Sequence, residues 1–227
     1  MNNCKLMDLG LVDYKVAWDL QKQLFNTKIQ YKLNKVESVD APHHLLVCEH
    51  PNVYTLGKSA ETHNLLLNKA ELVEKKISVY NIERGGDITY HGPGQLVVYP
   101  IFDIDSLKLG VKEFVYKIEE CIISTLLEYN IVSERIDGRI GIWIEKGTIN
   151  ERKIAAIGIK CSRYITMHGL ALNVNTDLKL FNHIIPCGIK DKEVTSVQKE
   201  INRSIDIVEI KNILISKFST IFELKFI

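Results

Sequence analysis

The sequence predicts an α/β (α+β) fold in which helices flank a mixed β-sheet. Apolar runs of strand length alternate with segments whose apolar residues repeat at helical spacing. No internal repeat, low-complexity tract or linker divides the 227 residues. Because domains of this length are common, we expect residues 1–227 to form a single domain.

The N-terminal third predicts two helices and two strand segments. The first helix begins after Asp13, which can cap it, because apolar residues repeat along one face. These residues are Tyr14, Ala17, Leu20, Leu24 and Phe25. Residues 44–57 predict a short strand, a break at Pro51 and a second β-rich piece that ends at Gly57. The charged segment 68–76 predicts a surface helix.

The middle of the chain predicts four strands and a long helix. Residues 95–104 have the composition of a buried strand, and residues 111–130 predict an amphipathic helix. The apolar stripe of this helix is Val111, Phe114, Ile118, Cys121, Ile122, Leu126 and Tyr129. Residues 140–147 and 152–162 predict a hairpin, because a polar turn separates two β-rich runs. Residues 167–175 predict one more strand.

The C-terminal segment predicts a last amphipathic helix. Asp206, with Glu209 three residues further on, resembles a capping box. The apolar positions that follow at helical spacing are Ile207, Ile210, Leu214, Phe218 and Ile221.

The composition is that of a globular protein with a buried core, since 46% of the residues are hydrophobic and 25% are charged. The 29 Lys and Arg residues balance 28 Asp and Glu residues, so the formal net charge is +1. This balance argues against a protein that binds nucleic acid or an anionic membrane. No run approaches the about 18 apolar residues that a membrane span requires.

The cysteines are scattered, odd in number and without a CxxC pair. This pattern argues against a disulfide framework and against a zinc site, so we expect no metal. It favours a reducing compartment, and the absence of an apolar N-terminal segment favours the cytoplasm. The five are Cys4, Cys48, Cys121, Cys161 and Cys187.

A glycine-rich segment at residues 83–100 surrounds Arg84 and His91 with four glycines and a proline. Glycine permits positive φ and lets a ligand approach the main chain. The segment lacks the glycine spacing of a P-loop or a Rossmann turn, so a phosphate site is not predicted. By themselves the glycines indicate a turn before a strand, and His91 indicates a hydrogen-bonded structural histidine.

Four blocks of the sequence, taken together, suggest a family. They are EHPNVYTLGKSA at residues 49–60, RGGDITYHGPGQLVVYP at 84–100, KIAAIGIKCSRYITMHGLALNVNTDL at 153–178 and IIPCGIKDKEVTSVQKE at 184–200. In this order they resemble the lipoyl(octanoyl) transferases of lipoate synthesis. The similarity begins at DLGLVDYKVAWDLQ near the N-terminus and covers most of the chain.

The resemblance implies the mixed-sheet fold of the biotin and lipoate protein ligase catalytic domains. It implies transfer of an octanoyl group from octanoyl-acyl carrier protein to a lysine of a lipoyl domain, through a cysteine thioester, as the first step of endogenous protein lipoylation. The implied acceptors are the lipoyl domains of 2-oxoacid dehydrogenase complexes and the glycine cleavage H protein. No cofactor, metal, nucleic acid or membrane is implied.

Within the resemblance, the catalytic residues are Cys187 and Lys153. A thiolate suits this transfer because it forms a thioester similar in energy to the donor. Cys187 lies between Pro186, which stiffens the chain, and Gly188, which opens space around the sulfur. A thiol with a pKa of about 8.5 is mostly protonated at pH 7, so the Lys153 ammonium would stabilise the thiolate. The Lys153 amine would then accept a proton from the incoming lysine.

Each of these residues has an alternative interpretation. Lys153 has the pattern of a solvated lysine at a strand end, and Lys160 competes with it. The two are seven residues apart, so on a regular strand they point to opposite faces and one of them serves the site. The family motif selects Lys153. We expect the four cysteines other than Cys187 to be small buried hydrophobic residues.

Three segments are expected to bind the acyl group. They comprise Arg84, Gly85, Gly86, Asp87, Ile88, Thr89, Tyr90 and His91, then Ala156, Ile157 and Gly158, then His168, Gly169, Leu170 and Ala171. Their small residues would let an eight-carbon chain lie against the backbone, and burial would contribute about 0.8 kcal/mol per CH₂. Backbone N–H groups of these turns would stabilise the oxyanion. The two histidines have either a structural or a catalytic supporting role.

Three other functions fit parts of the pattern. An ATP-dependent lipoate or biotin protein ligase shares the implied fold, but the sequence has no phosphate-binding motif. A catalytically silent acyl-binding protein would not need Cys187 and Lys153. A papain-like hydrolase would need a histidine partner for its cysteine, which these motifs do not supply.

Overall fold

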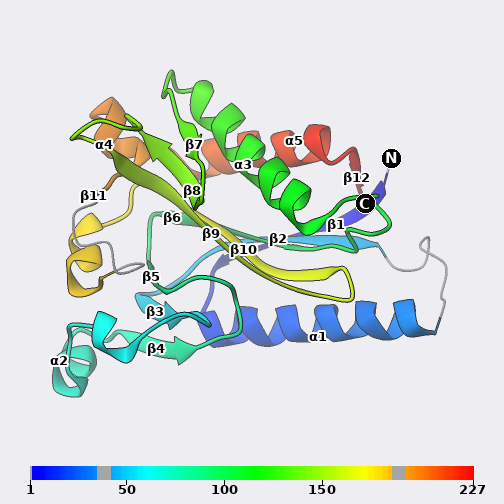
Figure 1. The fold of residues 1–227 in the computed structure, drawn as a ribbon, viewed down its shortest axis with the longest axis horizontal. Coiled ribbons are helices and arrows are strands. Elements are labelled where there is room, and N and C mark those ends of the chain that lie inside the picture. The colour runs from blue at the N-terminus through cyan, green and yellow to red at the C-terminus, as the bar shows by residue number, and fades with distance from the viewer. Residues whose placement is uncertain (1, 35–41, 186–192) are drawn as a thin grey trace.

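The computed structural model describes residues 2–34, 42–185 and 193–227, which form two sheets flanked by helices (Figure 1). The larger sheet, in spatial order, consists of β12 (Leu224–Phe226), β1 (Asn2–Leu11), β2 (His43–Glu49), β6 (Gln95–Ile101), β10 (Ile165–Asn173), β9 (Arg152–Ser162), β8 (Arg139–Ile144) and β7 (Glu134–Ile136), with β11 (Glu193–Val194) also paired to β9. The smaller sheet has the order β4 (Ser78–Asn81), β3 (Val53–Leu56) and β5 (Ile88–His91).

The larger sheet is mixed, as predicted. β1 runs parallel to both β12 and β2, and β11 runs parallel to β9. The ladder from β2 through β6, β10, β9 and β8 to β7 is antiparallel. The predicted hairpin is the β8–β9 pair, and the predicted buried strand is β6, in which every residue is buried.

The predicted break at Pro51 separates strands of different sheets. β2, before the break, pairs with β1 and β6, whereas β3, after it, pairs with β4 and β5. The sequence predicted two β-rich pieces here, but not the second sheet. Because β5 leads directly into β6, the glycine-rich segment lies where the chain passes from the smaller sheet to the larger one.

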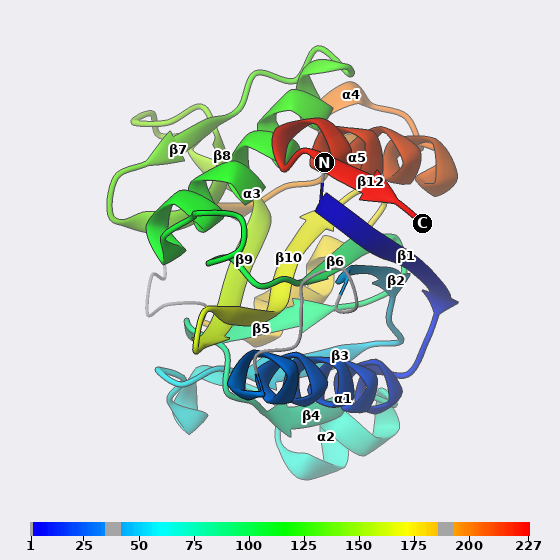
Figure 2. The same cartoon turned by 90° about the vertical axis from the view of Figure 1, so that its right-hand side faces the viewer.

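Helices cover both faces of the larger sheet (Figure 2). The helices are α1 (Tyr14–Leu33), α2 (Lys69–Glu74), α3 (Val111–Leu127), α4 (Val197–Ile201) and α5 (Ile207–Ile221), and the short 3₁₀ segments are η2 (Thr62–Asn64) and η3 (Leu178–His183). α3 and α5 pack together on one face, and α1 packs against β10 and β6 on the other. No helix among the described residues is long and apolar enough to cross a membrane.

The helix boundaries follow from the capping residues that the sequence contains. Asp13 Oδ1 accepts a hydrogen bond from Lys15 N at 2.8 Å, so α1 begins where predicted, and it continues to Leu33, beyond Phe25. Asn68 and Glu71 form a complete capping box at α2. At α5, Asp206 accepts from Val208 N, whereas the Glu209 carboxylate accepts from the Tyr129 hydroxyl at 3.0 Å.

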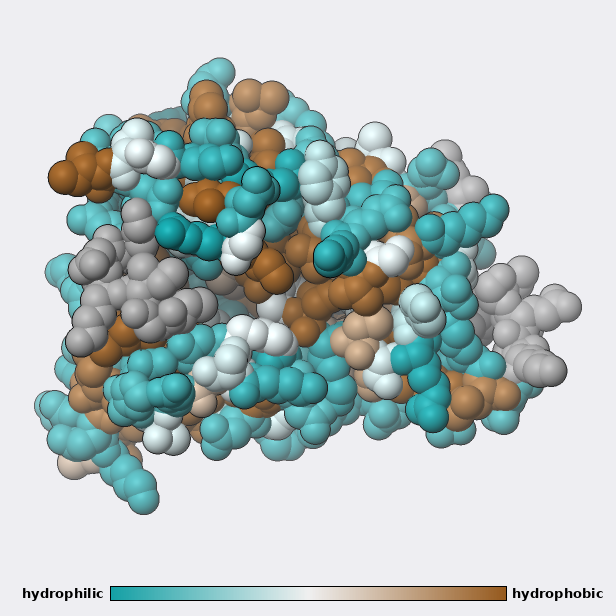
Figure 3. Space-filling model, in the orientation of Figure 1, coloured by the Kyte–Doolittle hydropathy of each residue, from teal (hydrophilic) through white to brown (hydrophobic). Residues whose placement is uncertain are grey.

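The apolar stripes of the helices form the core. Phe114, Ile118 and Cys121 of α3 are fully buried, as are Ile210 and Phe218 of α5. Val111, which the sequence placed on the stripe of α3, is instead 42% exposed. Apolar residues also gather on the surface, between the α3 side and the α1 side of the molecule (Figure 3).

Candidate acyl-binding site

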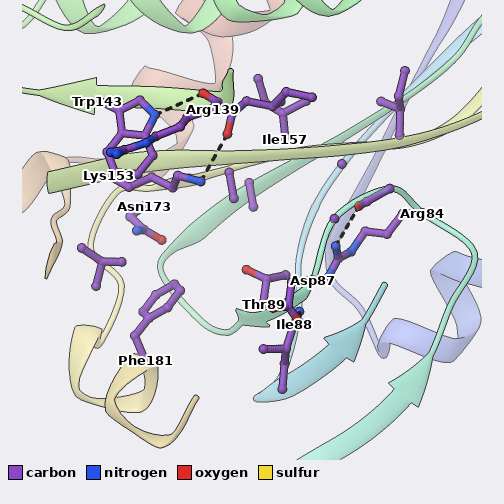
Figure 4. Close-up of a pocket in the computed structure, with 18 of the residues that line it drawn as sticks. Arg84, Asp87, Ile88, Thr89, Arg139, Trp143, Lys153, Ile157, Asn173 and Phe181 are labelled. Atoms are coloured by element: carbon purple, nitrogen blue, oxygen red, sulfur yellow. Dashed lines mark hydrogen bonds between the residues drawn. The ribbon is translucent and has the colours of Figure 1, made fainter. Parts of the chain in front are cut away.

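A cavity of about 380 Å³ lies between the two sheets. β8, β9 and β10 form one wall, and β5 with the preceding loop forms the other (Figure 4). The predicted residues that line it are Arg84, Gly85, Gly86, Asp87, Ile88, Thr89, Lys153, Ala156, Ile157, Gly158 and Ala171. The tertiary fold therefore brings predicted residues of two of the sequence blocks, 84–100 and 153–178, to one place.

The loop at residues 84–87 is held from both sides by backbone hydrogen bonds. Gly85 N donates to Ile159 O on β9 at 2.9 Å, and Lys58 N donates to Arg84 O at 3.0 Å. A Cβ at Gly158 would lie only 2.8 Å from Gly85 O, and Gly86 has φ of +89°. These two glycines are therefore required by close packing and by backbone conformation, in addition to the space that they leave for a ligand.

The charged side chains of this loop bind the protein itself. The Arg84 guanidinium is buried and donates through Nη2 to Thr55 O at 2.8 Å and to Thr55 Oγ1 at 3.0 Å. Asp87 accepts from Asn64 Nδ2 at 2.9 Å and from Ile88 N at 2.6 Å. These contacts join the loop to β3 and η2, so both side chains shape the cavity wall.

His91 belongs to a buried hydrogen-bond chain. Its Nδ1 donates to Gln95 Oε1 at 2.7 Å, because that oxygen can only accept. Gln95 Nε2 donates to Asn173 Oδ1 at 2.9 Å, and Asn173 Nδ2 donates to Thr195 O at 2.9 Å. Burial lowers the pKa of His91 to about 3, so the ring is neutral. The chain links β5, β6, β10 and the segment after β11.

Four of the predicted residues line a second cavity of about 50 Å³ without lining the larger one. His91, His168, Gly169 and Leu170 are on its wall. Tyr90 lies elsewhere: its side chain is fully buried against Phe181, and its hydroxyl donates to Asn52 Oδ1 at 2.8 Å. Since side chains alternate along β5, Tyr90 faces the core between the smaller sheet and η3.

Lys153 lies at one end of the larger cavity, beside Trp143 (Figure 4). Its Nζ donates to Ile140 O at 3.2 Å and lies 4.7 Å from the centre of the Trp143 ring. Gly141 has φ of +120°, and a Cβ there would come within 3.2 Å of Lys153 Cε. Sequence reasoning did not include Ile140, Gly141 or Trp143 in the site. The predicted hairpin was the available signal, since it places 140–144 beside Lys153.

The strand-parity argument about Lys160 was wrong, because β9 is not regular. Ile142 pairs with Ala155 whereas Trp143 pairs with Lys153, so β9 has one extra residue here, a β-bulge. Counting seven residues therefore does not separate the faces of Lys153 and Lys160. Lys160 instead forms an ion pair with Glu83, and its Nζ lies 5.2 Å from the Phe25 ring centre.

Cys187 lies outside the described residues, but residues on both sides of it line the cavity. Phe181 of η3 precedes it, and Glu193 and Val194 of β11 follow it. Val194 pairs with Lys153 in the parallel β11–β9 ladder. Ile185 N donates to Asn64 O at 2.8 Å, next to the loop that carries Asp87.

The other cysteines are in apolar surroundings. Cys4, Cys48 and Cys121 are buried, as predicted, while Cys161 is half-buried. Burial raises the pKa of Cys4 to about 12 and raises the pKa of the other three thiols as well. These thiols are therefore protonated at neutral pH and are poor nucleophiles. Among the residues that the structure describes, no cluster of His, Cys, Asp and Glu could hold a metal ion.

Sequence comparison identifies the relatives of this chain. The family profile of the lipoyl protein ligase A/B catalytic domain matches residues 13–219. A curated protein of Cytophaga hutchinsonii named octanoyltransferase is 50% identical over 223 residues, which are 96% of this chain and 91% of that protein. The chain belongs to the octanoyltransferase family. It is accordingly a transferase. A curated octanoyltransferase of Bacteroides fragilis is 48% identical, over 90% of this chain and 91% of that protein. One of Flavobacterium johnsoniae is 47% identical, over 96% of this chain and 96% of that protein.

Solved structures share the octanoyltransferase fold at low sequence identity. A bipartite lipoate protein ligase from Thermoplasma acidophilum superposes with a TM-score of 0.69 at 16% identity, covering 100% of this chain and 86% of that one. Lipoate-protein ligase A bound with ATP gives 0.69 at 15% identity, covering 100% and 87%. A biotin protein ligase from Aquifex aeolicus gives 0.52 at 12% identity, covering 98% and 71%. The predicted relation to the biotin and lipoate protein ligase fold is confirmed.

Proposed function

We propose that this chain transfers an octanoyl group from octanoyl-acyl carrier protein to a lysine of a lipoyl domain, through a thioester on Cys187. The observation that carries the proposal is the cavity between the sheets, which has Lys153 at one end and residues flanking Cys187 on its wall. The relatives named octanoyltransferase, at 45–50% identity, support the same acyl group. The ligases with the same fold are only 15–16% identical.

The cavity suits an aliphatic chain. Ile88, Ala156, Ile157, Ile159 and Ala171 present apolar surface to it from both walls. Burying seven carbons beyond the carbonyl at about 0.8 kcal/mol each contributes about 5 to 6 kcal/mol of binding free energy. Burial of the apolar chain alone therefore supplies this binding free energy, without a contact to a charged group.

The first half-reaction forms the acyl-enzyme. The Cys187 thiolate attacks the carbonyl carbon of the donor thioester, and the carbon–sulfur bond to the carrier breaks. Lys153, as an ammonium, lowers the pKa of the thiol and then supplies a proton to the departing carrier thiolate. Donor and product are both thioesters, so this step requires no energy source.

The second half-reaction forms the amide. The acceptor lysine amine attacks the carbonyl carbon of the Cys187 thioester, and the carbon–sulfur bond breaks. The Lys153 amine takes the proton from the attacking nitrogen, and the cysteine returns to its thiolate form. Cys187 and Lys153 titrate as a coupled pair, so an apparent pKa belongs to both.

The proposed partners follow from this reaction. The donor is octanoyl-acyl carrier protein, and the acceptors are lipoyl domains of 2-oxoacid dehydrogenase complexes and the glycine cleavage H protein. ATP, magnesium and other cofactors have no step to perform. We further propose that residues 1–227 act as one catalytic domain in the cytoplasm.

The proposal is tested by intact-mass spectrometry of the purified protein with octanoyl-acyl carrier protein and a chelator. We expect a hydroxylamine-sensitive octanoyl adduct on Cys187, followed by transfer to an added lipoyl domain. Cys187→Ser should abolish productive transfer, while Cys161→Ser should retain it and serves as the matched control. Transfer only from free octanoate with ATP and magnesium would show a ligase instead, and a fully active Cys187→Ala would exclude the covalent route.

A further inference from the structure

The small cavity of about 50 Å³ adjoins the larger one at the end away from Lys153. The two share Thr89, Ala156 and Ile157 on their walls. The small cavity has His168 and Tyr99 on its wall in place of Lys153 and Trp143. An acyl chain that enters beside Lys153 would therefore point its methyl end toward His168.

The strand register shows how far His168 lies from Lys153, for comparison with the length of an octanoyl group. His168 pairs with Ile159, which is six residues beyond Lys153 on β9. At about 3.3 Å per residue this separation is about 20 Å, slightly less with the bulge. One residue of an extended polypeptide has three backbone bonds and spans at most about 3.6 Å, which is about 1.2 Å per bond. At this length per bond, the seven carbon–carbon bonds of an extended octanoyl group span about 8 Å. An octanoyl group beside Lys153 thus ends near Ala156, which is on the wall of both cavities, so each further carbon extends into the small cavity toward His168.

His168 presents an unsatisfied polar ring to this space. Its side chain is 2% exposed, and neither ring nitrogen has a hydrogen-bond partner among the described residues. The backbone holds the residue in place, since φ is +60° and its N–H donates to Gln21 Oε1 at 2.9 Å. Buried ring nitrogens nearly always have a partner, either protein or ordered water.

We propose that the small cavity holds one or two ordered water molecules on His168, and that this polar end determines where the acyl chain stops. A volume of about 50 Å³ exceeds the about 10–15 Å³ that one water requires. Thr89, Tyr14 and Tyr99, which each carry a hydroxyl, line the same cavity. The inference rests on the proposed function, because it takes the larger cavity to hold the octanoyl chain.

The ring is suited to bind water as a neutral imidazole. Burial lowers the pKa of His168 to about 3, with the Arg84 and Lys160 charges acting in the same direction. A neutral ring has one donor and one acceptor nitrogen. Carbons beyond the eighth would enter the small cavity, displace this water and offer no hydrogen bond in return, which lowers affinity. His168 is thus a specificity-determining residue, and water discriminates against the longer chains.

The experiment compares His168→Leu with His168→Asn. Leucine makes the cavity apolar, whereas asparagine keeps polar groups in a larger cavity and tolerates positive φ. Binding of hexanoate, octanoate, decanoate and dodecanoate is measured by fluorescence displacement, and acyl loading from the matching carrier thioesters is measured by intact mass. We expect the leucine variant to gain about 4-fold per added methylene, so that decanoate binds about 15-fold tighter than octanoate.

The wild-type protein and the asparagine variant should favour octanoate over decanoate. If His168→Leu binds the four acids in the same order of affinity as the wild-type protein, the inference is overturned. An equal change of this order in both variants would also overturn it, because the size of the cavity and not its polarity would then determine the chain length. If His168→Leu does not fold, Thr89→Val removes a hydroxyl from the same wall and should shift the order in the same direction. A wild-type protein that binds the acids in this order but accepts no octanoyl from the carrier would refute the proposed function alone.

Discussion

Replacing Ala156 by leucine should shorten the acyl chain that the protein accepts. Ala156 is on β9, its side chain lines both cavities, and it pairs with Ala171 of β10, which lines the same wall. Leucine adds three carbon atoms to this wall. These atoms would occupy the space of about three methylene groups of the octanoyl chain.

The magnitude follows from the burial of those methylenes. Three groups at about 0.8 kcal/mol each contribute about 2.4 kcal/mol, which corresponds to about a 60-fold change. We therefore expect kcat/KM for octanoyl loading to fall about 60-fold in Ala156→Leu. Pentanoyl loading should stay near the wild-type value, since that chain is three carbons shorter. The assay is acyl loading from pantetheine thioesters of both lengths, with kcat/KM as the measure of transition-state binding.

Ala155→Leu is the matched control. Ala155 is 1% exposed and packs in the core on the α3 and α5 side of the sheet. Its enlargement should overpack that core by about 1 to 3 kcal/mol and lower Tm by about 2–4 °C per kcal/mol, with the octanoyl-to-pentanoyl ratio unchanged. An equal loss of loading for both chains in Ala156→Leu, or no loss for either, would contradict this prediction.

Three further predictions concern the dyad, a helix cap and the buried histidines. Lys153→Ala should slow iodoacetamide alkylation of Cys187 near pH 7, because it raises the pKa of the Cys187 thiol. The alkylation rate is measured by peptide mass mapping, and an unchanged rate would exclude Lys153 from this role. Asp206→Ala should destabilise the fold by about 1 kcal/mol through loss of the cap at Val208 N, measured as a Tm about 2–4 °C lower. An unchanged Tm in Asp206→Ala would contradict this prediction. Burial lowers the pKa of His91 and of His168 to about 3 from the ordinary 6.5. Between these pH values the unfolded chain therefore binds more protons than the folded chain. The free energy of unfolding has its full value above about pH 6.5 and falls below that pH by about 1.4 kcal/mol per pH unit for each histidine. A urea unfolding midpoint that stays constant from pH 7 to pH 5 would contradict this prediction.

The segments with strong local signals were predictable from the sequence. The stripe of α3 repeats within one or two turns, and Asp13 caps α1 through an amide two residues away, so neighbouring residues contain the information. The motif blocks likewise indicated the loop at residues 84–87 and the wall at 156–158. Both are continuous in sequence.

β1 and β12 could not be predicted in the same way. β1 is mostly partly exposed along its length and lacks a clean alternation of buried and exposed residues. It is a strand because it pairs in parallel with β2 and with β12, which lies at the opposite end of the chain. Parallel pairing depends on partners that are distant in sequence, so no local pattern announces it.

The sequence alone determined the helices α1, α2, α3 and α5, the caps at Asp13 and Asp206, and which family the motifs resemble, because those properties depend on side chains a few positions apart. The tertiary structure decided how the site is assembled. The bulge in β9 sets the position of Lys153 beside Trp143, and the positive φ of His168 turns its ring toward the small cavity. Both features arise where strands pair and pack against distant segments, and a local conformation imposed by such packing has no counterpart in local periodicity.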